Sequence, residues 1–244
     1  MKKKGNVLLK FIDCFFGILL VAVRVVVQLI VYLPLLIVFP LKRIGYKNYA
    51  NLKTGKILAL NHLSNFDAII SALFFPFAKI LAKKELGKNW FLRWFFKWLN
   101  VILVDRNNPE LSTIKKVSGE LKKGKTVVIF PEGTRNKKQP HKLLPLKTGV
   151  VFFARTANCP IIPASILKKS KPFVLNRMKI GEQIIIKDRS KEGLVSETEK
   201  LAIIMQSLHN DLLKKYEPKE YAKLDSETKS INLGLIHEET TNIE

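Results

Sequence analysis

The chain has 244 residues, enough for one compact domain with accessory segments. It carries 42 Lys and Arg against 20 Asp and Glu, and its net charge of +22 makes the surface attractive to anions such as nucleic acid, anionic lipid or an acidic protein. Its two cysteines, Cys14 and Cys159, lie far apart in different settings, which argues against a disulfide framework and against a zinc site of about four closely spaced ligands. No carboxylate cluster in the sequence indicates a metal site.

Residues 6–41 form an almost continuously apolar run and predict a membrane segment. A single helix of this length would measure about 54 Å, which exceeds the roughly 30 Å hydrocarbon core of a bilayer. Basic residues lie on both sides of the run, so the positive-inside tendency favours a hairpin that keeps both ends on the cytoplasmic side. We therefore expect residues 1–44 to be a membrane-associating hairpin of two helices, which anchors the protein at the cytoplasmic face of the cell membrane. One tilted span is the alternative.

Residues 89–102 are a second candidate for membrane contact. Tryptophan and phenylalanine mix there with Lys and Arg, a composition that suits the headgroup boundary of a bilayer. A core helix whose basic residues face water explains the pattern equally well.

Strands and helices alternate through the middle of the chain. The hydrophobic pattern predicts strands at 56–61, 78–82, 101–104, 126–130, 160–167 and 179–187, and helices at 66–75, 85–99, 110–123, 147–157 and 196–215. Such alternation predicts an α/β fold with a mixed, largely parallel sheet covered by helices on both faces. We expect this domain to span residues 45–216, followed by a polar C-terminal tail at 217–244.

His62 and Asp67 stand five positions apart, just after the first predicted strand of this domain. A neutral imidazole is the commonest general base near neutral pH, and a nearby carboxylate can fix its tautomer and stabilise the imidazolium. Within one helix the two side chains would point about 140° apart, so they can meet only if the helix begins between them. Ser64 is a natural N-cap there, with Asp67 in the capping-box position. The structural alternative is a carboxylate that complements the helix dipole beside an unrelated histidine.

The sequence Phe-Pro-Glu-Gly-Thr-Arg at 130–135 follows a β-branched run that predicts a buried strand. Ligands in open α/β sheets bind beyond the carboxyl ends of the strands. Gly133 lets the backbone approach a ligand closely, and Arg135 offers a planar fork that matches phosphate oxygens. A tight surface turn with a solvated arginine remains the alternative on composition alone.

Together these blocks resemble the glycerolipid acyltransferases, and within that family the bacterial lysophosphatidate acyltransferases. Further blocks of the family occur in the expected order: Val-Asp-Arg-Asn-Asn at 104–108 with Arg106 at its basic position, Cys-Pro-Ile-Ile-Pro at 159–163, Lys-Lys-Glu-Leu at 83–86 and Lys-Thr-Gly at 147–149. The resemblance covers residues 45–190. It departs from the family between residues 87 and 100, where aromatic residues replace the expected Pro-x-x-Gly-like element.

The resemblance implies transfer of a fatty acyl group to the sn-2 hydroxyl of lysophosphatidate, a membrane lipid, to yield phosphatidate. It implies acyl carrier protein or coenzyme A as the thioester carrier, with no separate cofactor, and a basic surface would attract the acidic carrier protein. His62 would remove the hydroxyl proton and Asp67 would orient it. The acceptor hydroxyl itself attacks, which agrees with the absence of a Gly-x-Ser-x-Gly elbow from the sequence.

Binding of the acceptor needs cationic and polar groups near the proposed base. For the phosphate we expect Arg135 first, then Lys83 and Arg106, and then Lys147. Within the 130–135 block, Glu132 could accept a hydrogen bond from a glycerol hydroxyl, and Gly133 and Thr134 complete the expected binding segment. We also expect the apolar segments 69–77 and 90–102 to flank a groove for the acyl chain.

Three other functions fit parts of the sequence. A related acyltransferase could use glycerol-3-phosphate or another lysophospholipid, because the blocks do not separate these acceptors. A basic, membrane-tethered nucleic-acid binder is disfavoured, because the lysines are scattered and no recognisable nucleic-acid-binding motif occurs. A structural membrane protein with a decayed catalytic domain would tolerate loss of His62.

Overall fold

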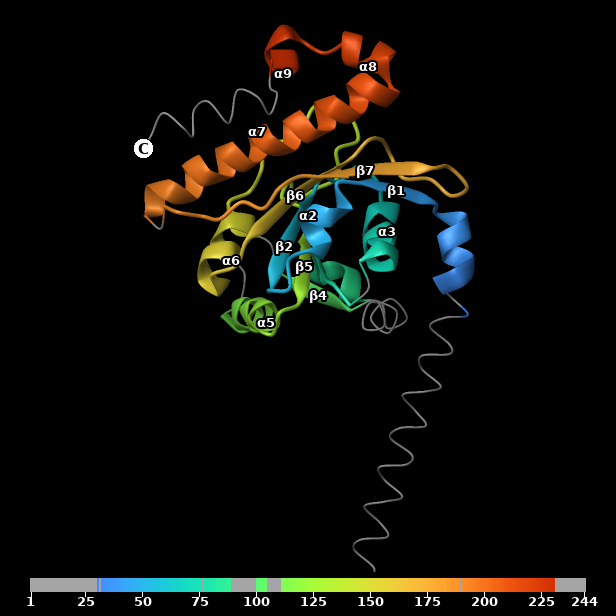
Figure 1. Cartoon of the computed structure of the whole chain (residues 1–244). Coiled ribbons are helices and arrows are strands. Elements are labelled where there is room, and N and C mark those ends of the chain that lie inside the picture. The colour runs from blue at the N-terminus through green and yellow to red at the C-terminus, as the bar shows by residue number, and fades with distance from the viewer. Residues whose placement is uncertain are drawn as a thin grey trace, which may run out of the picture.

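The centre of the molecule is a seven-stranded sheet with the order β1-β7-β6-β2-β5-β3-β4 (Figure 1). This computed structural model describes residues 30, 32–75, 77–88, 100–104, 111–188 and 190–230. The strands are β1 (Leu41–Ile44), β2 (Lys56–Leu60), β3 (Lys79–Lys83), β4 (Val101–Val104), β5 (Thr126–Ile129), β6 (Ile161–Ile166) and β7 (Asn176–Ile180). From β6 to β4 all neighbouring strands are parallel, whereas β7 runs antiparallel to β6 and parallel to β1. The predicted mixed, largely parallel sheet is confirmed.

Helices cover both faces of the sheet. They are α2 (Tyr46–Ala50), α3 (Phe66–Phe74), α5 (Leu111–Lys122), α6 (Gly149–Ala157), α7 (Lys191–Tyr216), α8 (Pro218–Ala222) and α9 (Ser226–Ser230), with a 3₁₀ helix at Lys84–Lys88. Side chains of α5, α6 and α7 pack with Ile57 and Ala59 on one face, and side chains of α2 and α3 pack with Leu58 and Leu60 on the other. Alternate residues of β2 therefore face opposite layers, and every residue of this strand is buried, as a parallel strand between two helical layers requires.

The edge of the sheet beyond β7 differs from the sequence expectation. Residues 41–44, assigned above to the N-terminal hairpin, form β1 and pair with β7 in the register Leu41 to Asn176. β7 itself begins three residues before the predicted strand, and the chain beyond it adds only an isolated bridge from Ile184 to Ile161. β1 was not predicted because a four-residue edge strand next to an apolar run has no hydrophobic pattern of its own.

The predicted membrane elements fall mainly outside the described residues. Residues 1–29 and 31, and residues 89–99, lie there, so the hairpin at 1–44 and the aromatic segment at 89–102 stay predictions. Of the helices within the described ranges, none is long and apolar enough to cross a membrane.

The segment predicted as a polar tail begins with ordered structure. Residues 217–230 contain α8 and α9, and Tyr221 and Leu224 pack against Leu212 and Leu213 of α7. The Asn210 side-chain amide also donates to the Thr228 carbonyl oxygen at 2.6 Å. This part of the segment therefore docks on α7, and residues 231–244 lie outside the described residues.

His209 of α7 is fully buried against β6, and its buried position predicts a pH dependence of stability. Its Nδ1 lies 2.9 Å from Ser165 Oγ, and burial lowers its pKa from 6.5 to about 4. Below pH 6.5 the unfolded chain therefore binds a proton that the folded chain does not, and stability falls as the pH drops from about 6.5 to about 4. The full effect is about 3 kcal/mol.

We expect His209→Gln to have a shallower acid-side loss of stability than the wild type, because glutamine does not titrate. Urea unfolding of both proteins across this pH range measures the difference between the two slopes. Equal slopes would show that His209 does not contribute to acid sensitivity.

Candidate active site

Loops at the carboxyl edge of the parallel strands carry the His62–Asp67 pair and the 130–135 block. His62 follows β2, and Glu132 follows β5, which lies beside β2. The Asn136 amide donates to the His62 carbonyl oxygen at 2.7 Å and so ties the loop after β5 to the loop after β2. This edge is where open α/β sheets place their ligands.

His62 and Asp67 meet in the way the sequence predicts. His62 Nδ1 lies 3.1 Å from Asp67 Oδ2, and α3 begins at Phe66, between the two residues. The same carboxylate oxygen accepts from the Ser64 amide at 2.6 Å, which is one half of the predicted capping box. Ser64 Oγ accepts from the Phe66 amide at 3.2 Å instead of from Asp67, and the helix is capped at Asn65.

Asp67 is completely buried, and four donors surround its carboxylate. Oδ2 accepts from His62 Nδ1, from the Leu63 amide at 2.7 Å and from the Ser64 amide, while Oδ1 accepts from Ser170 Oγ at 2.6 Å. An ionised carboxylate only accepts hydrogen bonds, so Nδ1 of His62 carries the hydrogen. Nε2 is then the basic nitrogen of the ring, whose side chain is 13% exposed.

Two neighbours hold the His62 ring and backbone in place. The ring stacks on Phe130, with centroids 4.2 Å apart and an interplanar angle of 25°. The backbone amide of His62 donates to Glu132 Oε1 at 2.8 Å. Asp67 and Phe130 therefore fix the imidazole, and Glu132 fixes the backbone that carries it, before any ligand binds.

Glu132 does not lie where the sequence analysis placed it. Its side chain is 3% exposed, and its second oxygen accepts from the Leu144 amide at 3.0 Å. Burial raises the pKa of this carboxyl, and the two amide donors partly offset that rise. Glu132 therefore links the loop that carries His62 to the loop that carries Leu144. The expected contact with a glycerol hydroxyl is wrong, because the Glu132 carboxylate is buried.

Gly133 and Lys147 pack against each other beside the His62–Asp67 pair. Gly133 adopts a left-handed conformation with φ of 67°, and a Cβ atom built there would lie 2.8 Å from Lys147 Cε. The Lys147 amide donates to the Pro131 carbonyl oxygen at 2.8 Å, which holds the lysine backbone against the same turn. Glycine is favoured at this position because side chains rarely adopt a φ of 67°, and a Cβ atom there would also displace the end of the lysine side chain.

The other predicted binding residues lie in different settings. Thr134 and Arg135 are exposed, and the Arg135 guanidinium makes no hydrogen bond or ion pair with any residue that the structure describes. Lys83 ends β3 and pairs with Glu85 at 3.0 Å. Arg106 lies outside the described residues. Across the described ranges, no group of three or more His, Cys, Asp or Glu side chains is placed to hold a metal ion.

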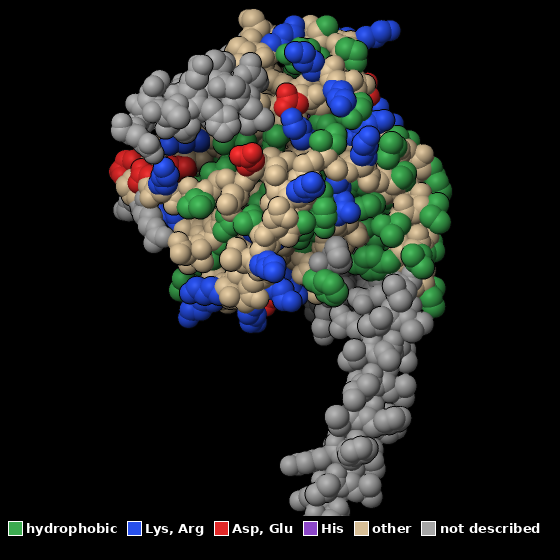
Figure 2. Space-filling view, viewed as in Figure 1, with side chains coloured by type: hydrophobic (Ala, Val, Ile, Leu, Met, Phe, Trp, Pro, Cys, Tyr) green, Lys and Arg blue, Asp and Glu red, His purple; other side chains and the backbone are tan. Residues whose placement is uncertain are grey.

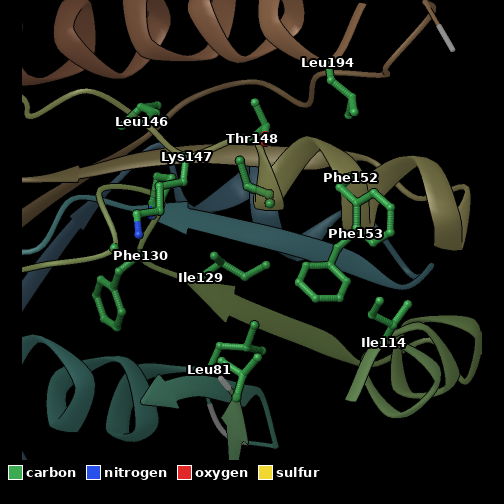
Figure 3. Close-up of a pocket in the computed structure, with 15 residues that line it drawn as sticks. Leu81, Ile114, Ile129, Phe130, Leu146, Lys147, Thr148, Phe152, Phe153 and Leu194 are labelled. Carbon is green, nitrogen blue, oxygen red and sulfur yellow. The ribbon is translucent and has the colours of Figure 1, made fainter. Parts of the chain in front are cut away.

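An apolar cavity of about 590 Å³ is lined in part by Phe130, the residue whose ring stacks on His62 (Figure 3). Phe130 and Lys147 line one end, and Ile114, Phe152 and Leu194 line the other. The cavity lies on the α5–α6 side of the sheet, whereas α3 covers the opposite face. None of residues 69–75 and 77 lines it, and residues 90–99 lie outside the described part of the chain, so a groove for the acyl chain beside these segments stays a prediction.

Ser170 is a site residue that the sequence analysis missed. It is 1% exposed, donates to Asp67 Oδ1, and accepts from Ser64 Oγ through its carbonyl oxygen at 3.2 Å. It belongs to the loop between β6 and β7, which is far from Asp67 in the chain but adjacent in the sheet. No local pattern distinguishes this serine from others, so only the strand order shows its role.

An α/β sheet with a carboxylate-held imidazole at its carboxyl edge is the arrangement of an enzyme that deprotonates a bound group. Residues 43–167 match the family model described as Acyltransferase, and the chain belongs to that family.

Named relatives agree with this assignment. The 1-acyl-sn-glycerol-3-phosphate acyltransferase of Bacillus subtilis is 35% identical over 170 residues, which cover 65% of this chain and 83% of the relative. The Helicobacter pylori protein of the same name is 33% identical over 140 residues, which cover 55% of this chain and 58% of that protein. The crystal structure of the 1-acyl-sn-glycerophosphate acyltransferase of Thermotoga maritima has the same fold, with a TM-score of 0.53 over 71% of each chain at 22% identity.

We expect Ser170→Ala to lower kcat for acyl transfer about tenfold with little change in KM, because one hydrogen bond to the carboxylate that orients His62 is lost. Steady-state kinetics and a thermal melt measure both parameters and the stability. Ser165→Ala is the matched control, because Ser165 is equally buried but contacts His209 instead of Asp67. Equal kcat in the two variants would show that Ser170 has no positioning role.

Proposed function

We propose that this chain transfers a fatty acyl group from a thioester to the sn-2 hydroxyl of lysophosphatidate, yielding phosphatidate. The observation that carries the proposal is His62 itself, with Nδ1 held by a fully buried carboxylate and Nε2 left as the base at the carboxyl edge of the sheet. The names of the relatives from Bacillus subtilis and Helicobacter pylori support lysophosphatidate as the acceptor.

In the proposed reaction, His62 Nε2 takes the hydroxyl proton while the hydroxyl oxygen attacks the thioester carbonyl carbon. Asp67 stabilises the imidazolium that forms. The tetrahedral intermediate then expels the thiolate, which takes the proton from the imidazolium, so the products are an ester and a free thiol. The substrate supplies the nucleophile, and the thioester supplies the acyl group without a separate cofactor.

The acceptor phosphate would bind to Arg135, which is exposed and unpaired among the described residues and follows directly on the turn at Gly133. Lys147 crosses that turn at the end of the cavity nearest His62 and offers a second cation (Figure 3). Lys83 is a weaker candidate because Glu85 already neutralises it.

The apolar cavity is the proposed place for a fatty acyl chain. Most of its lining is aliphatic or aromatic, and Phe130, which stacks on His62, closes the end nearest the base. Volumes of this size are typical of sites that bury most of an apolar ligand.

For the donor we propose an acyl carrier protein or coenzyme A thioester, and the net charge of +22 favours either of these acidic carriers. We place the enzyme at the cytoplasmic face of the membrane, held by its apolar N-terminal run.

Acyl transfer by the full chain reconstituted in vesicles tests the proposal. Acyl carrier protein and coenzyme A thioesters would each be offered with lysophosphatidate, glycerol-3-phosphate or another lysophospholipid. We expect phosphatidate from lysophosphatidate and much slower reaction of the other acceptors. Faster reaction of another acceptor would overturn the substrate assignment, and the lack of product with every acceptor would overturn the reaction.

A further inference from the structure

Residue 30 and residues 32–38 are helical, and they carry apolar side chains on two faces. Tyr32, Leu35 and Leu36 face the domain and pack with α3, while Ile30, Leu33 and Ile37 are 64%, 59% and 75% exposed. Spacings of three and four residues put these three exposed side chains on one helix face, here called the outer stripe. The outer stripe has no protein partner among the described residues.

A second group of exposed apolar residues adjoins the outer stripe. In the loop between β6 and β7, Phe173 is 77% exposed, Val174 40% and Leu175 42%, and we call residues 173–175 the apolar loop. The Phe173 amide donates to the Val38 carbonyl oxygen at 2.6 Å, which joins the loop to the end of the helical segment. Figure 2 shows hydrophobic side chains gathered along this flank of the molecule, on the right of the view.

The protein holds the apolar loop in its exposed position. Asn176 is 4% exposed, and its side-chain amide donates to the Val174 carbonyl oxygen at 2.9 Å and to the Pro40 carbonyl oxygen at 3.3 Å. Phe173 adopts a left-handed φ of 57°, which is unfavourable for a residue with a Cβ atom. Burial within the chain does not offset this strain, so the loop is built to present phenylalanine outward.

Charge and chain direction indicate what covers this surface. The apolar sequence of residues 6–29 leads directly into the outer stripe, and Lys42, Lys169 and Lys171 are exposed in the chain segments next to the apolar loop. A second copy of a chain with net charge +22 is repelled, whereas an anionic bilayer is attracted. A fixed apolar surface with neighbouring lysines fits the headgroup boundary of such a bilayer.

We propose that the apolar loop inserts into the boundary of an anionic bilayer beside the outer stripe, as a second membrane contact separate from the N-terminal apolar run. The contact also positions the site, because Ser170, which holds Asp67, lies three residues before Phe173. Docking through this loop brings the carboxyl edge of the sheet to the lipid surface. The inference concerns membrane contact alone and does not require acyl transfer.

The insertion depth of one side chain tests the proposal directly. Phe173→Cys, made in the full chain with Cys14→Ser and Cys159→Ser, would carry an environment-sensitive dye on vesicles of equal parts phosphatidylglycerol and phosphatidylcholine. Ile203→Cys in the same background is the control, because Ile203 is 42% exposed on α7. We expect a blue shift and quenching by spin-labelled lipid at position 173 only. Equal, water-like signals from the two labels on vesicle-bound protein would overturn the proposal, whether or not the protein forms phosphatidate.

A binding measurement gives an independent result. We expect replacement of Phe173, Val174 and Leu175 together by serine to weaken vesicle binding roughly tenfold or more. The double variant Val195→Ser and Ile203→Ser removes apolar side chains that are 54% and 42% exposed on α7, and we expect it to bind as the wild type does. Equal weakening in both variants would show that general surface hydrophobicity, instead of the apolar loop, contacts the membrane.

Discussion

Replacement of His62 by alanine is expected to lower kcat for acyl transfer by about 10²–10⁴-fold, the usual contribution of a general base. The loss is expected in kcat because the imidazole acts on the hydroxyl proton during attack. The fold should persist, since Asp67 keeps its donors from Leu63, Ser64 and Ser170 when the imidazole is removed. Initial rates with a long-chain acyl thioester and lysophosphatidate, with a thermal melt beside them, measure both effects.

His141→Ala is the matched control for that variant. His141 is also partly exposed, but its Nε2 pairs with Glu220 of α8 at 3.3 Å, whereas Nδ1 of His62 contacts Asp67. We expect this control to keep the wild-type kcat. An alanine variant at position 62 that turns over as fast as the wild type would remove His62 from its role as base.

Asp67 is expected to show two separable effects, one on rate and one on stability. Asparagine fits the same space, can still accept from the Leu63 and Ser64 amides, and can donate to Ser170 Oγ. It lacks the charge that stabilises the imidazolium, so we expect Asp67→Asn to lose about 10² or more in kcat with little loss of stability.

Asp67→Ala is expected to lose stability as well as activity. Truncation leaves the amides of Leu63 and Ser64 and the hydroxyl of Ser170 without their partner in a fully buried place, at about 1–3 kcal/mol each. Urea unfolding of the two variants separates the effects. Wild-type kcat in Asp67→Asn would restrict the carboxylate to an architectural role, and equal stability of the two variants would show that the hydrogen bonds contribute little.

Much of the site follows from local chain geometry. A short loop joins His62 to Asp67, and α3 begins within that segment. The Ser64 hydroxyl accepts a hydrogen bond from the Phe66 amide at this helix start. The two side chains therefore meet because nearby residues specify where the helix begins. The apolar runs at β2 and β5 likewise predict buried parallel strands, because a strand between two helical layers has no polar face.

Contacts between segments that are distant in the chain could not be predicted from the sequence. Ser170 reaches Asp67 only because β6 pairs with β2, and no sequence pattern predicts that these two strands are neighbours. Glu132 is part of a block expected to face the ligand, but the loop that carries Leu144 folds over it and turns it into a buried brace. The sequence also did not predict the apolar cavity between the sheet and α5 and α6, because its lining residues come from several separate segments of the chain.

The sequence by itself determined the alternating α/β pattern, the meeting of His62 with Asp67 and the position of the 130–135 block at the end of a strand. These features depend on residues close together in the chain, where periodicity and capping act directly. The tertiary structure alone decided the place of β1 at the sheet edge, the burial of Glu132 and the contact of Ser170 with Asp67. It also decided the hydrogen bond that joins the apolar loop to the end of the helical segment at Val38. Each of these depends on which strands become neighbours, a choice set by packing across the whole sheet instead of by any local pattern.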